Sequence, residues 1–212
     1  MASALATATF DRVSITPIAP PPPAPATLPA GWSQQDIGPV GKPGAGSFDA
    51  AADTFTVTGA GAEVWGAADA LRYVYRPLAG NGRIVARVPT VQNVNAWTKA
   101  GVMIRESMSA GAAQAFMLVS PGKGTAFQRR PAAGGASVST AGPLVTAPPW
   151  VAIERIGDLV SASVSADGVT WTIVGSDTIP MIASVYVGLA VSSHTTAATA
   201  TAAFTNVGIT VP

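Results

Sequence analysis

The sequence predicts an all-β fold, a two-sheet antiparallel β-sandwich of the jelly-roll type. From residue 31 onward, apolar and polar residues alternate with a period of two in short runs, which is typical of half-buried strands. Gly, Pro, Asn and Asp separate these runs, and no long amphipathic helical pattern is present. A set of about ten to thirteen short strands without helices is best accommodated by two packed sheets.

Two strands are expected to pair as a hairpin across the Gly- and Asn-containing segment 78–82. In that arrangement one face of the hairpin carries four arginines: Arg72, Arg76, Arg83 and Arg87. Further strands are expected at 54–58, 101–106, 114–119, 125–130, 151–156, 159–165, 169–174, 185–191 and 199–210. The clearest turn is 165–168, where Asp167-Gly168 supplies the positive φ of a tight connection.

The composition favours a protein that works outside the cytosol. Hydrophobic residues make up 48% of the chain but charged residues only 11%, so uncharged polar side chains must cover the surface. A formal net charge of +1 creates no long-range field that attracts nucleic acid or an anionic membrane. No apolar run is long enough for a membrane-spanning helix. We therefore expect neither nucleic-acid binding nor membrane insertion.

The cysteine and histidine counts limit the metal chemistry. The chain has no cysteine and a single histidine, His194, which excludes disulfides, thiolate sites and a conventional zinc site. Calcium takes oxygen ligands, and the candidates for it are Glu63 and Asp69, which flank Trp65 in a Gly-rich segment. Core or turn roles for these two carboxylates are the alternative. No other cofactor is expected.

The chain repeats its own ending. Residues 5–16 (LATATFDRVSIT) and 199–210 (TATAAFTNVGIT) are identical at seven of twelve positions, and both end in F-x-x-V-x-I-T. We interpret residues 1–16 as the last strand of a preceding repeat, 17–30 as a Pro-rich polyproline-II linker and 31–212 as the sandwich domain. The parent polypeptide is then a tandem array, and this chain begins within the last strand of one unit.

A duplicated strand cannot share the place of the last strand, but it can add to an open sheet edge of its own domain or of a neighbour. Phe10, Val13 and Ile15 would compete for the position of Phe204, Val207 and Ile209, so the spare strand must add to an open sheet edge or stay unpaired. Addition to a neighbouring molecule would build a filament by β-augmentation. The alternative is that the segment has no role beyond its origin in the preceding repeat.

Several strings of the sequence resemble one superfamily: GWSQQDIG (31–38), FTVTGAGAEVWGAAD (55–69), WTKAGVMIRES (97–107), PPWVAIERIGD (148–158), SADGVTWTIVGS (165–176) and VYVGLAVSSH (185–194). They are similar to the concanavalin A-like lectin/glucanase superfamily, and specifically to uncharacterised laminin-G-like modules repeated in secreted or cell-surface bacterial proteins. The resemblance implies a curved sandwich whose first and last strands are neighbours. It also implies an extracellular location within a larger adhesive or glycan-active protein.

Catalytic motifs are missing from the sequence. Retaining glucanases of this superfamily use paired carboxylates in an E-x-D-x-x-E strand, which this chain lacks. Glu106 and Glu154 are the acidic residues on predicted strands, and an acid pair assembled from separate strands is the remaining enzymatic alternative. His194 has no G-x-S-x-G nucleophile elbow to serve. We therefore predict that the protein is not an enzyme.

Sugar binding requires an exposed aromatic face with planar polar groups beside it. Trp65 and Trp97 lie in segments rich in Gly, Asn and Gln, with core positions as the alternative; Trp32 is expected to seal the sandwich where the chain enters it. The candidate ligand-binding residues are Trp65, Asp69, Trp97, Asn95 and Lys99. The predicted arginine face is a second candidate, for acidic polysaccharides, or else an ordinary solvated sheet face.

These observations predict a non-catalytic extracellular module that binds carbohydrate or serves as an adhesive spacer. The second hypothesis is a self-assembling structural subunit in which segment 3–16 adds to a neighbour. A glycoside hydrolase of the same fold is the third.

Overall fold

The computed structural model describes residue 11 and the stretches 27–144 and 149–211. Regular structure in these residues consists of β-strands without a helix, so the predicted all-β class is confirmed. The described stretches contain no helix that is long and apolar enough to span a membrane. Segment 1–16, with Phe10, Val13 and Ile15, lies outside the described residues except for Asp11.

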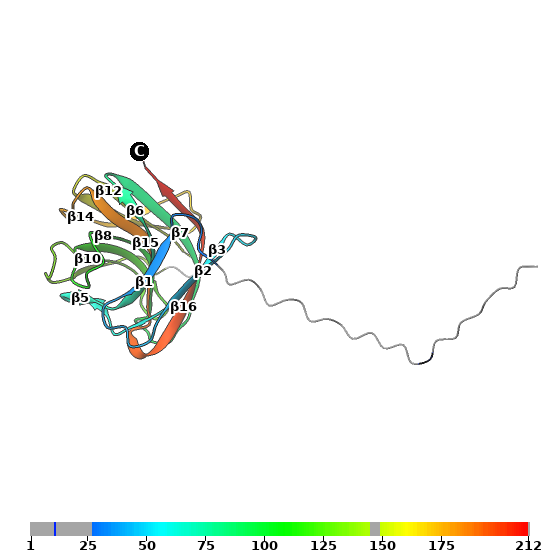
Figure 1. Ribbon diagram of the computed structural model, residues 1–212. Helices are drawn as coiled ribbons and strands as arrows, with labels where there is room; N and C mark the ends of the chain where they lie inside the picture. The colour runs from blue at the N-terminus through cyan, green and yellow to red at the C-terminus, as the bar shows by residue number, and fades with distance from the viewer. Residues whose placement is uncertain (1–10, 12–26, 145–148, 212) are drawn as a thin grey trace, which may run out of the picture.

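Seven antiparallel strands form the first sheet, in the order β1-β6-β15-β8-β9-β10-β11 (Figure 1). Along the chain these strands are β1 (Ser33–Ile37), β6 (Leu71–Ala79), β8 (Lys99–Arg105), β9 (Gln114–Ser120), β10 (Gly124–Arg130), β11 (Val138–Ala141) and β15 (Ser184–Ser192).

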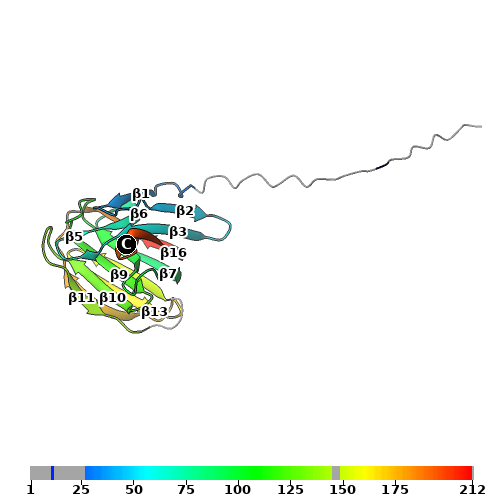
Figure 2. The ribbon, with the colours of Figure 1, turned by 90° about the horizontal axis from the view of Figure 1, so that it is seen from below.

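The second sheet also has seven antiparallel strands, in the order β14-β13-β12-β7-β16-β3-β2. They are β2 (Ala45–Asp49), β3 (Thr54–Gly61), β7 (Gly82–Val91), β12 (Trp150–Ile156), β13 (Leu159–Ser165), β14 (Thr172–Thr178) and β16 (Thr195–Thr210). The short strands β4 (Val64–Trp65) and β5 (Ala68–Asp69) pair as a separate hairpin. Figure 2 shows the same layers from below.

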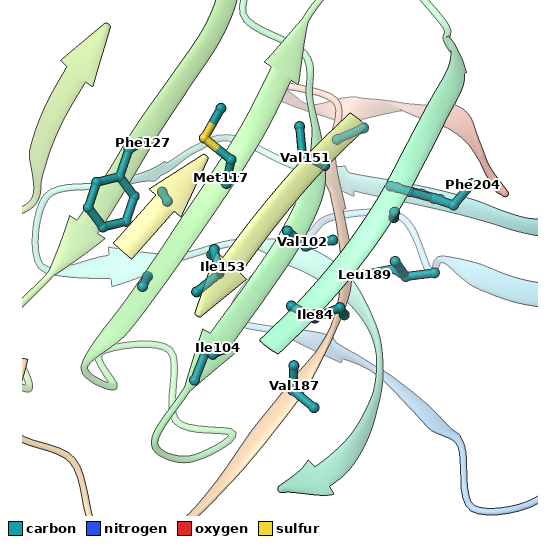
Figure 3. Close-up of a cluster of buried hydrophobic side chains, with 14 of the residues drawn as sticks. Ile84, Val102, Ile104, Met117, Phe127, Val151, Ile153, Val187, Leu189 and Phe204 are labelled. Carbon is teal, nitrogen blue, oxygen red and sulfur yellow. The ribbon is translucent and has the colours of Figure 1, made fainter. Parts of the chain in front are cut away.

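The apolar core lies between the two sheets. Figure 3 shows side chains of the first sheet, such as Val102 and Leu189, meeting side chains of the second, such as Ile84, Ile153 and Phe204. All five are buried. The alternation that predicted the strands is therefore the alternation of core-facing and outward-facing residues. The predicted two-sheet sandwich is confirmed.

The predicted hairpin of runs 71–76 and 83–88 is wrong. β6 pairs with β1 and β15, whereas β7 pairs with β12 and β16, so the two strands lie in opposite sheets. Val74 of β6 and Ile84 of β7 both face the core between the sheets. Two consecutive strands can turn their apolar faces toward each other in this way only if the chain crosses from one sheet to the other between them.

The expected neighbourhood of the first and last strands is also wrong. β16 pairs with β3 and β7 in the second sheet, and β1 pairs with β6 in the first. Ile37 at the end of β1 belongs with Leu71 and Tyr73 to an apolar cluster of the first sheet, which accounts for the placement of β1.

Packing against the core begins at Leu28, inside the predicted linker. Trp32 is half-buried, and its ring lies 4.8 Å from that of Phe55, as expected for a residue that seals the entry of the chain. The predicted turn at 165–168 is present with Gly168 at φ +78°. Backbone N–H groups of Thr170 and Val169 donate to the Asp167 carboxylate and hold its pKa below the usual range.

Both faces of the first sheet are covered, and every residue of β8 is buried. Ala100, Val102 and Ile104 face the core, so by alternation Lys99, Met103 and Arg105 lie on the outer face. There a second apolar cluster forms: Ile37, Val64, Leu71, Tyr73, Met103, Phe116, Leu118, Ala126 and Ala190. Two charged residues of β8 consequently lie beneath a covering layer that includes Val64 of the β4–β5 hairpin.

Candidate functional site

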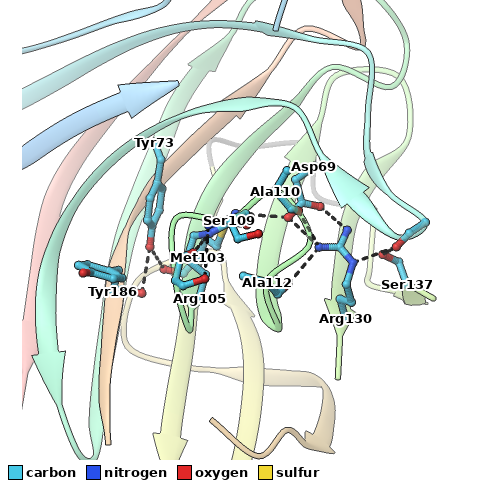
Figure 4. A network of polar contacts seen from close by, with 12 residues as sticks. Asp69, Tyr73, Met103, Arg105, Ser109, Ala110, Ala112, Arg130, Ser137 and Tyr186 are labelled. Carbon is cyan, nitrogen blue, oxygen red and sulfur yellow. Dashed lines mark hydrogen bonds and ion pairs between the residues drawn. The ribbon is translucent and has the colours of Figure 1, made fainter. Parts of the chain in front are cut away.

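A buried ion-pair network holds the β4–β5 hairpin onto the outer face of the first sheet. Asp69, at the end of β5, accepts hydrogen bonds from Arg130 through both carboxylate oxygens, at 2.5 and 2.9 Å. Arg105 donates to the same carboxylate at 3.3 Å. All three side chains are completely buried (Figure 4). A buried carboxylate with two guanidinium partners ties the hairpin to β8 and β10 at once.

The remaining guanidinium donors bind backbone carbonyls of the covering loops. Arg130 donates to Gly66 O at 2.9 Å and to Ala112 O at 3.1 Å, and Arg105 donates to Ser107 O at 2.7 Å. Figure 4 shows these groups converging on the network. The two arginines therefore position the segment that carries Trp65 as well as the loop after β8.

A pocket of about 300 Å³ opens beside this network. Residues from widely separated parts of the chain line it: Glu63, Trp65, Trp97, Lys99, Gln128, Ser139 and His194. The structure thus brings together three of the predicted ligand-binding residues, Trp65, Trp97 and Lys99. The pocket volume is near the lower end of the range for ligand pockets, which measure about 300–1,000 Å³.

Two indoles provide the aromatic part of the pocket. Trp65 on β4 and Trp97 in the loop before β8 each expose 42% of their surface. The Trp97 loop is shaped by Asn95, whose Oδ1 accepts the Trp97 N–H at 2.8 Å, while Thr98 Oγ1 accepts the Asn95 N–H at 3.0 Å. Asn95 therefore positions Trp97 and is not among the lining residues. The ammonium of Lys123 lies 5.2 Å from the centre of the Trp97 ring.

The polar part of the pocket is a cluster of three ionisable side chains. Lys99, only 2% exposed, pairs with Glu63 Oε1. Glu63 Oε2 lies 2.9 Å from Nδ1 of His194, which has a positive φ of 61° between β15 and β16. Burial lowers the pKa of Lys99 to about 8, although the adjacent carboxylate acts in the opposite direction. Burial and the neighbouring Lys99 lower the pKa of His194.

Gln128 adds unused hydrogen-bonding capacity. It lies on β10, opposite Ser139 of β11, and only 4% of its surface is exposed. Its amide oxygen is buried without a hydrogen-bond partner in the described structure. Buried polar groups are almost always hydrogen-bonded in folded proteins, so this oxygen in the pocket wall is free to accept a hydrogen bond from water or from a ligand.

The two calcium candidates have different partners. Asp69 is paired with Arg105 and Arg130 in the buried network, whereas Glu63 lines the pocket and pairs with Lys99 through Oε1. In the described part of the chain no group of three or more His, Cys, Asp or Glu side chains is arranged to hold a metal ion.

The four predicted arginines do not share one face. Arg72 and Arg76 belong to the first sheet and Arg83 and Arg87 to the second. Arg72 is paired with Asp36 at 3.4 Å, and the guanidinium of Arg83 lies 4.7 Å from the centre of the Trp171 ring. The predicted acidic-glycan patch required all four arginines to lie on one face of a hairpin. The structure has no such hairpin, so the four residues do not form one patch.

Sequence reasoning missed Gln128 and Ser139 as site residues. Both lie on strands, and only the strand order brings their face to β4 and to the loop that carries Trp97. The two strand glutamates do not form an acid pair in this pocket. Glu106 follows β8 and accepts the N–H of Ile182 at 3.1 Å, and Glu154 is exposed on β12 of the opposite sheet.

Comparisons with solved structures show a shared fold at low identity. A functionally unknown protein from Saccharomyces cerevisiae matches with a TM-score of 0.67 and 15% identity, over 86% of this chain and 97% of that one. The carbohydrate-binding module CBM66 from Bacillus subtilis matches with a TM-score of 0.55 and 15% identity, over 85% and 96%. The lectin UEA-II, complexed with galactose, matches with a TM-score of 0.55 and 10% identity, over 85% and 92%.

These β-sandwich neighbours are consistent with the predicted concanavalin A-like superfamily. No protein-family model matches the chain, and no curated protein matches it in sequence. At these identities the comparisons show the fold alone.

The buried network makes a stability prediction. Asp69→Asn leaves two buried guanidinium groups without their carboxylate and is expected to lower the free energy of unfolding by about 3–5 kcal/mol. Urea unfolding followed by circular dichroism measures this loss. Asp177→Asn is the matched control, because its pair with Arg129 is partly exposed and is worth less than about 1 kcal/mol. Equal losses in the two variants would contradict the assigned role of Asp69.

Lys99 makes a pH prediction. Its pKa is about 8 in the folded protein, whereas an unfolded lysine titrates near 10.4, so the unfolded chain binds more protons between these values. The free energy of unfolding is therefore expected to rise by about 2 kcal/mol between pH 7 and pH 10 through this group. Lys99→Met removes that contribution, and urea unfolding of both proteins at the two pH values tests it. An identical pH dependence in the two proteins would rule out the lowered pKa.

Proposed function

We propose that this protein is a carbohydrate-binding module and that its ligand occupies the pocket between Trp65 and Trp97. The observation that carries the proposal is the combination of two half-exposed indoles with the buried polar side chains Lys99 and Gln128 around one small cavity. Sugar rings present apolar C–H faces and polar hydroxyl edges, and this pocket offers a partner for each.

The aromatic side chains supply the apolar contact. Each indole keeps 42% of its surface exposed, although both lie next to the well-packed face of the first sheet. Exposed tryptophans that share a pocket are typical of binding sites, because burying their surface against a ligand is strongly favourable. The Asn95 hydrogen bond to the Trp97 backbone holds its segment in place before the ligand arrives, which reduces the entropy lost on binding.

The polar side chains supply orientation. Glu63 and Ser139 offer acceptors, Lys99 holds the Glu63 carboxylate in place through its ammonium, and Gln128 has an amide oxygen that is not used within the described structure. A few convergent polar groups on apolar walls are the usual composition of small-molecule sites. The fold shared with a carbohydrate-binding module and a galactose-complexed lectin supports the same interpretation.

We propose binding without hydrolysis. Glycosidases need two carboxyl groups at the scissile bond, and Glu63 is the single carboxylate among the described residues that line the pocket. An extracellular location as one module of a larger surface protein is part of this proposal.

Trp65→Ala and Trp97→Ala are each expected to weaken sugar binding about tenfold or more, since each removes one aromatic contact surface. A glycan array identifies ligands of the unaltered protein, and isothermal titration calorimetry then compares the variants. Trp171→Ala is the matched control, because Trp171 packs against Arg83 of the second sheet and does not line the pocket. The sugar affinity of this variant should equal that of the unaltered protein. Sugar affinities that survive both pocket substitutions would disprove this site.

A second function is supported by the position of β16. Phe204 of this strand is fully buried, and Val207 and Ile209 pack against the same core. The duplicated segment carries Phe10, Val13 and Ile15 at the same spacing, so its side chains are suited to replace β16 of a neighbouring molecule once that strand leaves its place between β7 and β3. We propose that strand exchange of this kind joins copies of the protein.

Deletion of residues 1–16 tests strand exchange. The full chain is expected to form oligomers whose mass, measured by light scattering, falls to that of the monomer in the deletion variant. Phe10→Asp is the point control, because a charge cannot occupy the buried position of Phe204. A full chain that is already monomeric at high concentration would refute the assembly.

A further inference from the structure

The charged groups of the pocket differ in how far a ligand can reach them. Lys99 and Glu63 carry opposite charges, but the lysine side chain is 2% exposed while that of Glu63 is 33% exposed. The third ionisable group, His194, is 28% exposed. The accessible formal charge in the lining is therefore the negative charge of the Glu63 carboxylate.

The hydrogen-bonding groups show the same asymmetry. A carboxylate is an acceptor only, and Glu63 Oε2 has no donor, since Nδ1 of His194 lies nearby without forming a hydrogen bond. The amide oxygen of Gln128 is a second acceptor without a donor. Two acceptors of the pocket are thus unused, and the hydroxyl hydrogens of a ligand are suited to both.

From this asymmetry we infer that the pocket selects neutral sugars through hydroxyl groups donated to Glu63 and discriminates against acidic sugars. The inference rests on the proposed function and specifies the ligand class of the same site. A uronic acid replaces a hydroxymethyl donor with a carboxylate, which adds an acceptor and brings a second negative charge toward Glu63. Like charges repel more strongly in a partly desolvated pocket than in water.

Other charged side chains nearby do not reverse this preference. Lys99 lines the pocket, but its ammonium is already paired with Glu63 and its side chain is only 2% exposed. Lys123 lies over the Trp97 ring, but it is exposed and is not a lining residue, so salt screens its field. The acidic Asp69 is neutralised within its own network with Arg105 and Arg130.

The experiment compares matched pairs of methyl glycosides, each a neutral sugar and its uronic acid, in the gluco, galacto and manno series. Binding is measured by calorimetry and by quenching of tryptophan fluorescence. In every series that binds, the neutral member is expected to bind about tenfold tighter than the uronic acid. Uronic acids that bind as tightly as their neutral partners, or tighter, would overturn the inference while the proposed sugar site stands.

Glu63→Gln identifies the source of the preference. The amide keeps an acceptor oxygen but leaves the charge of Lys99 uncompensated, so the neutral-to-acidic ratio is expected to fall to about threefold or less, or to invert. The double variant Glu63→Gln/Lys99→Gln removes both charges, so the net charge of the pair stays at zero. It is also expected to lose the preference for neutral over acidic sugars. Lys123→Gln is the control and should keep the tenfold ratio.

Thermal unfolding of each variant checks that the fold is retained before binding is compared. A tenfold preference that persists in both Glu63 variants would overturn the inference, because the discrimination would then not come from this carboxylate. If no member of any pair binds the unaltered protein, the proposed function itself fails and the inference fails with it. The two failures are thereby distinguished.

Discussion

The ion pairs of Asp69 with Arg105 and Arg130 are the constraint on which the rest of the structure depends. They are completely buried, and they join the β4–β5 hairpin to two strands of the first sheet. A buried ion pair is seldom a large net source of stability, because desolvation of the charges offsets much of their attraction. Its effect here is specific placement, since the observed position of the hairpin satisfies the two guanidinium groups, the carboxylate and the loop carbonyls together. Among these carbonyls is Gly66 O, next to Trp65, which also accepts a hydrogen bond from Ser137.

The position of the hairpin forms one wall of the pocket on the outer face of the first sheet. Without the covering hairpin and loops, the outer face of the first sheet would expose Leu71, Phe116 and Leu118, which are all buried. With the cover in place, the apolar part is buried, and Lys99, at the start of β8, has a buried ammonium that pairs with Glu63. The same cover presents Trp65 opposite the loop of Trp97. The lowered pKa of Lys99, the exposure of the indoles and the unsatisfied Gln128 amide thus share one structural origin.

The accuracy of the strand predictions and the failure of the hairpin have one cause. Alternation indicates which residues of a strand are buried, and this information is contained in the local sequence. It therefore predicts β3, β9, β10, β12, β13 and β15 within a few residues of their observed bounds. It does not report which strand lies alongside. The same alternation fits β6 and β7 as partners in one hairpin and as strands of opposite sheets, and only the packing of the two sheets distinguishes these arrangements.

By itself, the sequence determined the all-β class, and it predicted the packing of Trp32 and named the two tryptophans that line the pocket. Each of these depends on local signals: the period of burial, or an aromatic residue in a segment rich in Gly, Asn and Gln. Tertiary structure alone decided that Asp69 is a structural anchor, that the four arginines are divided between two sheets, and that Glu63, Gln128, Ser139 and His194 join the pocket. These are non-local facts, since residues as far apart as Glu63 and His194 come together through the strand order, which no periodicity within a single strand encodes.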